Sequence, residues 1–385
     1  MVYLDNAATT KMKKSVVEAM LQYFTETFGN ASSVYTTAGQ AARKALMSAR
    51  SDVAKAIGAE DAEIFFTSGG SEADNWAIKG TSGKSAKKHI ITTTIEHHAV
   101  LHTCEYMEKQ GYSVTYVPVD EFGMVSVKDI ENAITDDTFL VSVMFANNEI
   151  GTINPIAEIG KLCREKGIYF HTDAVQATGA VPIDVKAMNI DLLSMSGHKF
   201  HGPKGVGALY IRKGVKIENL LHGGAQEKGR RATTENVAGI VGMAAALKDA
   251  VEHMEEKTEK IVALREKLIN GILETVPYTR LNGHREKRLP NNTSFCFKYI
   301  EGESLLLSLD LKGYIVSSGS ACTSGSLDPS HVLLGIGLPH ETAHGSMRVS
   351  LSEFNTEEEI DAFIKELAPI VQRLRDMSPL YEGVE

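Results

Sequence analysis

A lysine at the end of a short apolar run is the residue best suited to covalent chemistry. Lys199 follows the run 191–196 in the stretch SGHKFHGPKG, close to Ser196, His198 and Lys204. Desolvation and positive neighbours lower the pKa of such a lysine and make its amine nucleophilic toward a carbonyl. Ser196 and Lys199 also match the Ser-x-x-Lys spacing of penicillin-binding hydrolases, but no Lys-Thr-Gly accompanies them and the pair follows a strand pattern. The pattern favours a Schiff-base lysine.

Other apolar runs also end in polar residues. Gly70 and Ser71 open a helical pattern whose free N–H groups favour a phosphate, although a plain turn and N-cap would explain them equally well. Asp173 and Gln176 follow the run 167–172, where a helix-capping aspartate is the ordinary alternative. His97 follows the run 89–95. Together these residues suit pyridoxal phosphate, which needs a phosphate cradle, a carboxylate for its ring nitrogen, a stacking imidazole and a Schiff-base lysine.

Two histidine patterns resemble metal sites, but their context disfavours both. The stretch HETAH, 340–344, matches a zinc protease motif, which needs a longer helix than Pro339 and Gly345 allow at its two ends. His97 and His98 are adjacent and point in different directions, so they do not easily share one metal. We therefore expect no resident metal.

One cysteine stands apart from the other three. Cys322 lies in SSGSACTSGS, 317–326, a run of small residues that predicts a loop. Cys104, Cys163 and Cys296 fall in helical or strand patterns, where core packing is the ordinary role. The four form no Cys-x-x-Cys pair, which disfavours disulfides and zinc ribbons and fits a reducing cytoplasm.

The composition is that of an ordinary globular protein. The 385 residues are 43% apolar and 23% charged, with a net charge of −9 that argues against nucleic acid or an anionic membrane as the main partner. We find no apolar run long enough to span a membrane. The start MVYLDNAATT lacks the basic and apolar regions of a signal peptide, so we expect a cytoplasmic protein.

Strand and helix patterns alternate along the first two thirds of the chain and predict an α/β fold with a mainly parallel seven-stranded sheet. The expected strands lie at 62–68, 89–95, 113–119, 139–146, 167–174, 191–196 and 207–212. One long helix is expected over 249–276, then strands within 291–300, 314–320 and 346–354, and a closing helix whose capping box is Thr356 with Glu359. We expect a large domain at 15–255 and a small α+β domain from 1–14 and 256–385, with the cysteine loop at about 317–331.

The chain resembles the fold-type I pyridoxal phosphate enzymes of the class-V aminotransferase family. Within that family it resembles the group I, NifS-like cysteine desulfurases. The resemblance covers nearly the whole chain and lies in YLDNAATT, TSGGSEADN, EHHAV, NNEIG, DAVQ, SGHKFHGPKGVGALY, EGESLL, SSGSACTS and MRVSL. It implies conversion of L-cysteine to L-alanine, with the sulfur left as a persulfide on the enzyme and delivered to iron–sulfur cluster or thio-cofactor synthesis. Selenocysteine lyase activity on the same scaffold is the alternative, and a non-catalytic scaffold is a third.

The resemblance also implies the role of each site residue. Lys199 forms the Schiff base, Asp173 pairs with the pyridine nitrogen, and Gln176 bonds the phenolic oxygen. His97 stacks on the ring and is an acid–base candidate, while Cys322 is the nucleophile that receives sulfur. Further matches are the phosphate contacts Gly70, Ser71, Ser196 and His198, the substrate residues Asn148 and Arg348, and Thr234, which reaches the phosphate of the other subunit of a homodimer.

The expected partners are L-cysteine, a second copy of the chain, and a sulfur acceptor or iron–sulfur scaffold protein, whose cluster Cys322 would touch only during transfer.

Three residues depart from the family pattern: Ala31, Tyr35 and Thr233. Thr233 replaces a common glycine, and a β-branched residue does not easily adopt positive φ, so we expect the geometry that carries Thr234 to be affected. The end SPLYEGVE lacks an extended tail used for scaffold binding in some relatives.

Overall fold

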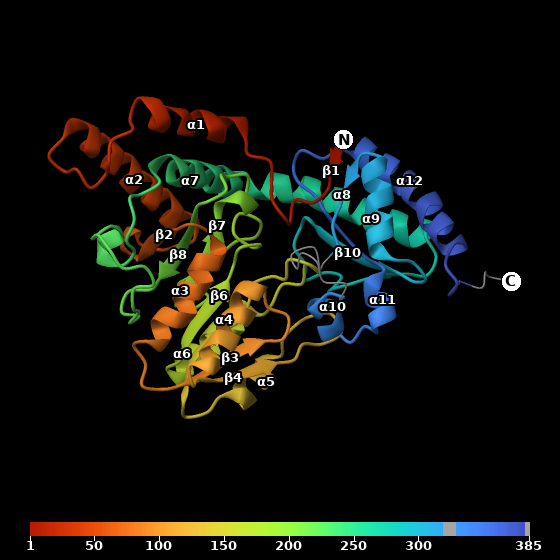
Figure 1. The fold of residues 1–385 in the computed structure, drawn as a ribbon, viewed down its shortest axis with the longest axis horizontal. Helices are drawn as coiled ribbons and strands as arrows, with labels where there is room; N and C mark the ends of the chain where they lie inside the picture. The colour runs from red at the N-terminus through yellow and green to blue at the C-terminus, as the bar shows by residue number, and fades with distance from the viewer. Residues whose placement is uncertain (319–328, 382–385) are drawn as a thin grey trace.

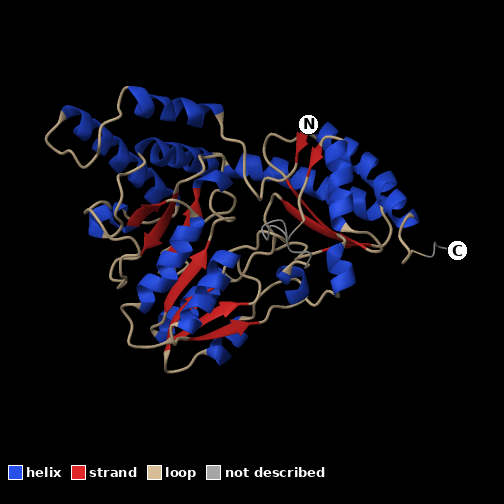
Figure 2. Cartoon of the chain, viewed as in Figure 1, coloured by secondary structure: helices blue, strands red, loops and turns tan. Residues whose placement is uncertain are grey.

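The computed structural model describes residues 1–318 and 329–381, and its centre is a seven-stranded sheet (Figures 1 and 2). Strand β8 is antiparallel to both of its neighbours and the other neighbouring pairs are parallel. The seven predicted strands all belong to this sheet, which confirms the mainly parallel α/β fold. In spatial order the strands are β2 (Ile64–Thr67), β8 (Gly207–Ile211), β7 (Leu192–Ser196), β6 (Tyr169–Asp173), β5 (Thr138–Ser142), β3 (His89–Thr93) and β4 (Ser113–Val117).

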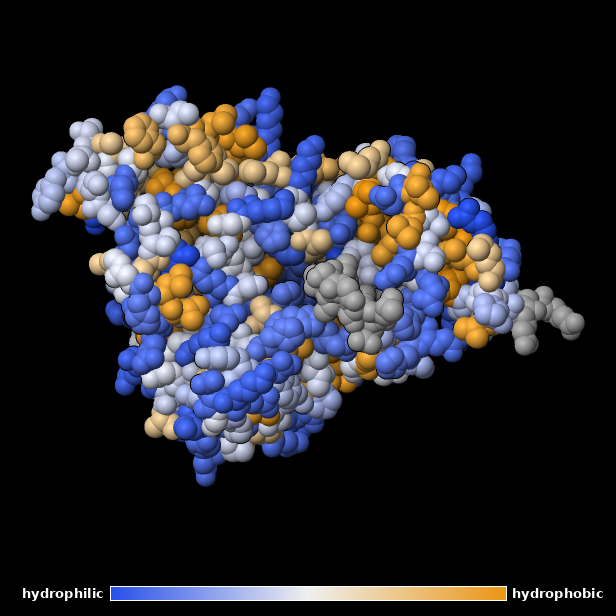
Figure 3. Space-filling model, in the orientation of Figure 1, coloured by the Kyte–Doolittle hydropathy of each residue, from blue (hydrophilic) through white to orange (hydrophobic). Residues whose placement is uncertain are grey.

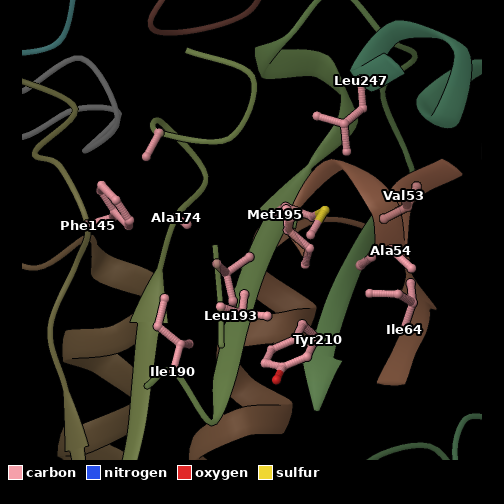
Figure 4. Close-up of a cluster of buried hydrophobic side chains, with 14 of the residues drawn as sticks. Val53, Ala54, Ile64, Phe145, Ala174, Ile190, Leu193, Met195, Tyr210 and Leu247 are labelled. Atoms are coloured by element: carbon pink, nitrogen blue, oxygen red, sulfur yellow. The ribbon is translucent and has the colours of Figure 1, made fainter. Parts of the chain in front are cut away.

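Helices cover both faces of this sheet, which is why its central strands are apolar on both sides. One apolar core lies between the sheet and α2, α6 and α7, and Figure 4 shows part of it around Met195 and Leu247. A second core on the opposite face includes Trp76 and Cys104. The helices are α1 (Lys14–Thr25), α2 (Thr37–Ala56), α3 (Gly70–Ser82), α4 (His98–Lys109), α5 (Val127–Ala133), α6 (Ile156–Lys166) and α7 (Val237–Glu252).

A second lobe has its own core, formed by α8, α9, α12 and the neighbouring strands (Figure 1). Leu4 lies in this core and β1 pairs with β11, so the first residues of the chain pack with its last third. The expected division into two domains, with a boundary near residue 255, stays a prediction. The strands are β1 (Val2–Tyr3), β9 (Thr279–Leu281), β10 (Asn292–Phe297), β11 (Tyr314–Ile315) and β12 (Ser346–Ser350); the helices are α8 (Met254–Thr275), α9 (Gly302–Leu311), α10 (His331–Gly335), α11 (His340–His344) and α12 (Glu357–Asp376).

The helix expected over 249–276 is in fact interrupted. Helix α7 ends at Glu252 and α8 begins at Met254, because His253 adopts φ −114° and ψ 19°. No proline or glycine marks the break; the ammonium of Lys257 donates to the carbonyl and the carboxylate of Asp249 across it. The closing helix begins as predicted, with the Thr356 and Glu359 capping box in place.

The HETAH stretch forms only the short helix α11, which Gly345 ends immediately before β12. Within residues 1–318 and 329–381, no three His, Cys, Asp or Glu side chains group closely enough to hold a metal ion. None of the helices in these ranges is both long enough and apolar enough to cross a membrane.

Candidate active site

A cavity of about 240 Å³ opens at the carboxyl ends of the parallel strands, where ligands bind in open α/β sheets. It gathers residues that are up to 341 positions apart in the chain, from Ala7 to Arg348. Most of the predicted site residues line it: Gly70, Ser71, His97, Asn148, Asp173, Gln176, Ser196, His198, Lys199 and Arg348.

The amine of Lys199 points at the N-terminal segment. Lys199 ends a short 3₁₀ turn, η2 (Gly197–Lys199), that directly follows β7. Its Nζ donates hydrogen bonds to the carbonyl oxygens of Ala7 and Ala8, at 2.6 and 2.8 Å. The amide of Gln176 donates to the same Ala7 oxygen at 2.9 Å. The carbonyls of Ala7 and Ala8 therefore help to orient the side chains of Lys199 and Gln176 in the cavity.

Asp173 and His97 form the electrostatic centre of the cavity. Asp173 ends β6 and accepts a hydrogen bond from the N–H of Val175 at 2.9 Å. Burial raises the pKa of its carboxyl, and the nearby His97 and Lys199 oppose that rise. His97 caps α4, because its Nδ1 accepts the N–H of Ala99 at 3.1 Å. Burial also lowers the pKa of His97, so the ring is neutral near pH 7 with its proton on Nε2.

The start of α3 forms a cradle for an anion. Gly70 is the first residue of α3, and a Cβ there would lie only 2.6 Å from the Cγ2 of Val175, so a larger residue would clash with another residue of the cavity wall. Ser196 and His198 face the same end. Burial and the nearby Lys199 and Lys204 lower the pKa of His198 to about 4. The helix N-terminus and neutral hydrogen-bonding groups suit a phosphate.

Arg348 also lines the cavity. It lies on β12 and its side chain is only 3% exposed. Its Nη2 donates to the carboxylate of Asp5 at 2.8 Å, and its Nη1 donates to the carbonyl of Asn148 at 3.0 Å. Among the described residues, the buried Nε meets no acceptor. The guanidinium is therefore held in place by two partners while it keeps a free donor for a carboxylate.

Sequence reasoning missed three buried acids near the site: Asp74, Glu96 and Glu149. Asp74 lines the cavity one helical turn after Gly70. Residues four apart lie on the same face of a helix, so this spacing was the sequence signal that could have identified Asp74. Its Oδ1 lies 3.6 Å from His171 Nε2. Burial and Asp173 raise the pKa of Asp74, while burial lowers that of His171 to about 3. His171 is therefore neutral at pH 7, and its contact with Asp74 is not an ion pair.

One described residue of the predicted site, Thr234, does not line the cavity in this chain. Thr234 is exposed on a loop outside it. Its neighbour Thr233 does adopt a positive φ, of 115°, contrary to the usual preference of a β-branched residue. Earlier in the same segment, Glu227 forms a buried ion pair with Arg50. Cys322 lies outside the described residues.

The three described cysteines have the packing role predicted for them. Cys104, Cys163 and Cys296 are free and buried in apolar cores. Burial raises the pKa of their thiols to about 12, 12 and 11 respectively. They therefore remain protonated and chemically inert at neutral pH.

Comparisons with known proteins agree with this geometry. The family model for class-V aminotransferases matches residues 2–363. The cysteine desulfurase IscS of Clostridium botulinum (strain Hall) is 63% identical, over 99% of this chain and 97% of its own length. A solved NifS-like protein has a TM-score of 0.91 at 41% identity, and the match covers 97% of this chain and 100% of the solved one. A structure of SspA in complex with cysteine has a TM-score of 0.81 at 38% identity, over 92% and 100%.

The residues of the cavity also fit the cofactor on which this family depends. An amine, a buried carboxylate and an anion cradle lie in one cavity, and Gly70 leaves it open. The buried Oδ1 of Asp74 has no hydrogen-bond partner within the described ranges, so the cavity wall retains an unused polar atom. The chain therefore belongs to the class-V aminotransferase family of pyridoxal phosphate-dependent enzymes, among its NifS-like cysteine desulfurases.

Proposed function

We propose that this cysteine desulfurase converts L-cysteine to L-alanine with the residues of the Lys199 cavity, and that Cys322 receives the sulfur. The observation that carries the proposal is the placement of Lys199, Asp173 and Arg348 around one cavity. Lys199 and Asp173 supply an amine and a carboxylate for the cofactor, and Arg348 supplies a buried cation for the substrate. The cysteine held by the SspA structure supports the same substrate class.

Pyridoxal phosphate, when bound, draws electrons from the substrate and so weakens the bonds at its α-carbon. We assign Lys199 as its covalent anchor and Asp173 as the partner of its ring nitrogen. Gln176 is assigned to its phenolic oxygen and His97 to its ring face. The residues assigned to its phosphate are Gly70, Ser71, Ser196, His198 and, from a second subunit, Thr234.

The substrate is oriented by Arg348 and Asn148. Arg348 takes the substrate carboxylate through its free edge, because a guanidinium forms two parallel hydrogen bonds with a carboxylate. With substrate bound, the Nζ of Lys199 would accept the proton of the α-carbon. His97, neutral and protonated on Nε2, is placed to donate a proton in the same cavity.

The proposed sulfur transfer needs no external oxidant. The Cys322 thiolate forms an S–S bond with the substrate sulfur as the carbon–sulfur bond breaks. The carbon keeps the electron pair, takes up a proton and becomes the methyl group of alanine. Cys322 is left as a persulfide that an acceptor or iron–sulfur scaffold protein takes up, and a reducing cytoplasm is the compartment we assign.

A second copy of the chain is the partner that we propose for Thr234 and for helix α1. Val17, Leu21 and Phe24 recur at helical spacing on α1 and stay exposed, which leaves an apolar face without cover (Figure 3). Phe24→Glu is expected to shift the protein from dimer to monomer in sedimentation velocity. A wild-type protein that sediments as a monomer would refute this assignment.

Two variants test the chemistry. The purified protein is expected to bind pyridoxal phosphate and show its near-visible absorption band, which Lys199→Ala should lose. Cys322→Ser should keep the band and bind cysteine, but release no alanine and form no persulfide. A colourless wild type, or normal turnover by Cys322→Ser, would refute the corresponding assignment. Comparing alanine release from cysteine and selenocysteine separates the desulfurase from a selenocysteine lyase.

A further inference from the structure

The turn that contains Asn148 contacts several parts of the site. Asn147 shapes this turn, because its Oδ1 accepts the N–H groups of Glu149 and Ile150 at 2.8 and 3.0 Å. The carbonyl of Asn148 then accepts Arg348 Nη1. The next side chain, that of Glu149, points away from the solvent and is 5% exposed.

Glu149 accepts a hydrogen bond from a serine of the second lobe. The hydroxyl of Ser330 donates to Glu149 Oε2, and it accepts the N–H groups of Val332 and Leu333 at 3.1 and 3.4 Å as the N-cap of α10. Burial raises the pKa of Glu149 to about 7, although Ser330 and Arg348 oppose the rise. Burying a carboxyl is costly, and an apolar side chain would pack there at lower cost, so packing alone does not explain Glu149.

Ser330 and Ser317 lie on either side of the segment that includes Cys322. Ser317 pairs with Arg348 through two backbone hydrogen bonds, of 3.2 and 2.6 Å. Both sides of the segment are therefore joined to the same site: Ser317 to the backbone of Arg348, and Ser330 through Glu149 to the turn that holds the guanidinium of Arg348.

We propose that Glu149 is a positioning residue for sulfur transfer: by accepting the Ser330 hydroxyl, it fixes the start of α10 relative to Arg348 and its substrate. This inference rests on the proposed role of Cys322. A misplacement of about 1 Å between reacting groups costs about 100-fold in rate. Loss of the contact should therefore act on sulfur transfer and leave the binding of cysteine intact, because Glu149 does not line the cavity.

The test uses the full-length enzyme loaded with cofactor. Cysteine affinity is read from the change in cofactor absorbance, and persulfide formation from a single turnover with alkylation of the product. Glu149→Ala is expected to bind cysteine as the wild type does and to form persulfide about 10- to 100-fold more slowly. Ser330→Ala should show the same loss, and the double variant no further loss, because all three remove one contact.

Conservative and control variants separate positioning from folding. Ser330→Thr keeps the hydroxyl and Glu149→Gln keeps an acceptor, so both should retain most of the rate. Ser126→Ala removes the equivalent N-cap from α5, outside the cavity, and should leave persulfide formation unchanged. If Glu149→Ala does not fold, the comparison of Ser330→Ala with Ser330→Thr decides.

Several outcomes would overturn the inference. These are a wild-type rate in Glu149→Ala or Ser330→Ala, an equal loss of binding and transfer, and additive losses in the double variant. Cys322→Ser, measured in parallel, keeps this question separate from the proposed function. If Cys322→Ser still forms product, the nucleophile is wrong; if it is inactive while Glu149→Ala is normal, only the role of Glu149 is wrong.

Discussion

Replacing Arg348 by methionine tests the recognition of the substrate. Methionine keeps an apolar stem of similar length but removes the guanidinium, which is 3% exposed and bonded to Asp5 and to the carbonyl of Asn148. Under the proposed function, this buried cation binds the substrate carboxylate. Its loss leaves both the substrate carboxylate and Asp5 without a charged partner.

The size of the effect follows from this burial. Truncating one partner of a buried, hydrogen-bonded charge pair costs about 2–5 kcal/mol. At about 1.4 kcal/mol for each factor of ten, kcat/KM for L-cysteine should fall by about 30- to 5,000-fold. Most of the loss should appear in KM, because the carboxylate contact is made before and during the reaction.

The assay compares L-cysteine with its methyl ester, whose carboxylate is masked. Wild type and Arg348→Met should differ strongly on L-cysteine and only slightly on the ester. Arg375→Met is the matched control: this arginine is fully buried in the second lobe, where it donates to the carbonyls of Lys298 and Pro277. It should lower stability without discriminating between the substrates. An equal loss on both substrates in Arg348→Met would show that the arginine acts on structure alone.

Three further predictions concern stability. Glu227→Ala leaves Arg50 buried without its bidentate partner, and should cost about 3–5 kcal/mol in urea unfolding; a loss below about 1 kcal/mol would contradict a structural ion pair. Thr233→Gly should raise Tm slightly. Glycine relieves about 1–3 kcal/mol of backbone strain at φ 115°, which outweighs the cost of about 0.4–1 kcal/mol from the greater entropy of the unfolded chain. A lower Tm in this variant would contradict the strain. His171, with a pKa of about 3, binds its proton more readily once unfolded, so stability falls by up to about 1.4 kcal/mol per pH unit below about pH 6.5. His171→Gln should flatten that fall in thermal scans from pH 7 to 5, and an unchanged slope would refute the assignment.

Much of the fold follows from local pattern. Short apolar runs separated by amphipathic stretches predicted the seven strands of the large sheet, because a strand covered on both faces must be apolar throughout. The same regularity located the site, since the carboxyl ends of parallel strands meet at one edge. Asp173 and Lys199 could therefore be placed together from sequence, although 25 residues separate them.

Tertiary structure alone decided the contacts that aim these groups. The carbonyls of Ala7 and Ala8 receive Lys199, and a backbone acceptor has no signature in sequence. Asp5 meets Arg348 only because β12 passes beside the N-terminal segment, and the contact between two such distant residues depends on the packing of the whole lobe. Sequence thus determined which chemical groups stand at the strand ends. Packing over long separations decided their partners, their protonation and their direction, because burial and neighbouring charge exist only in the folded chain.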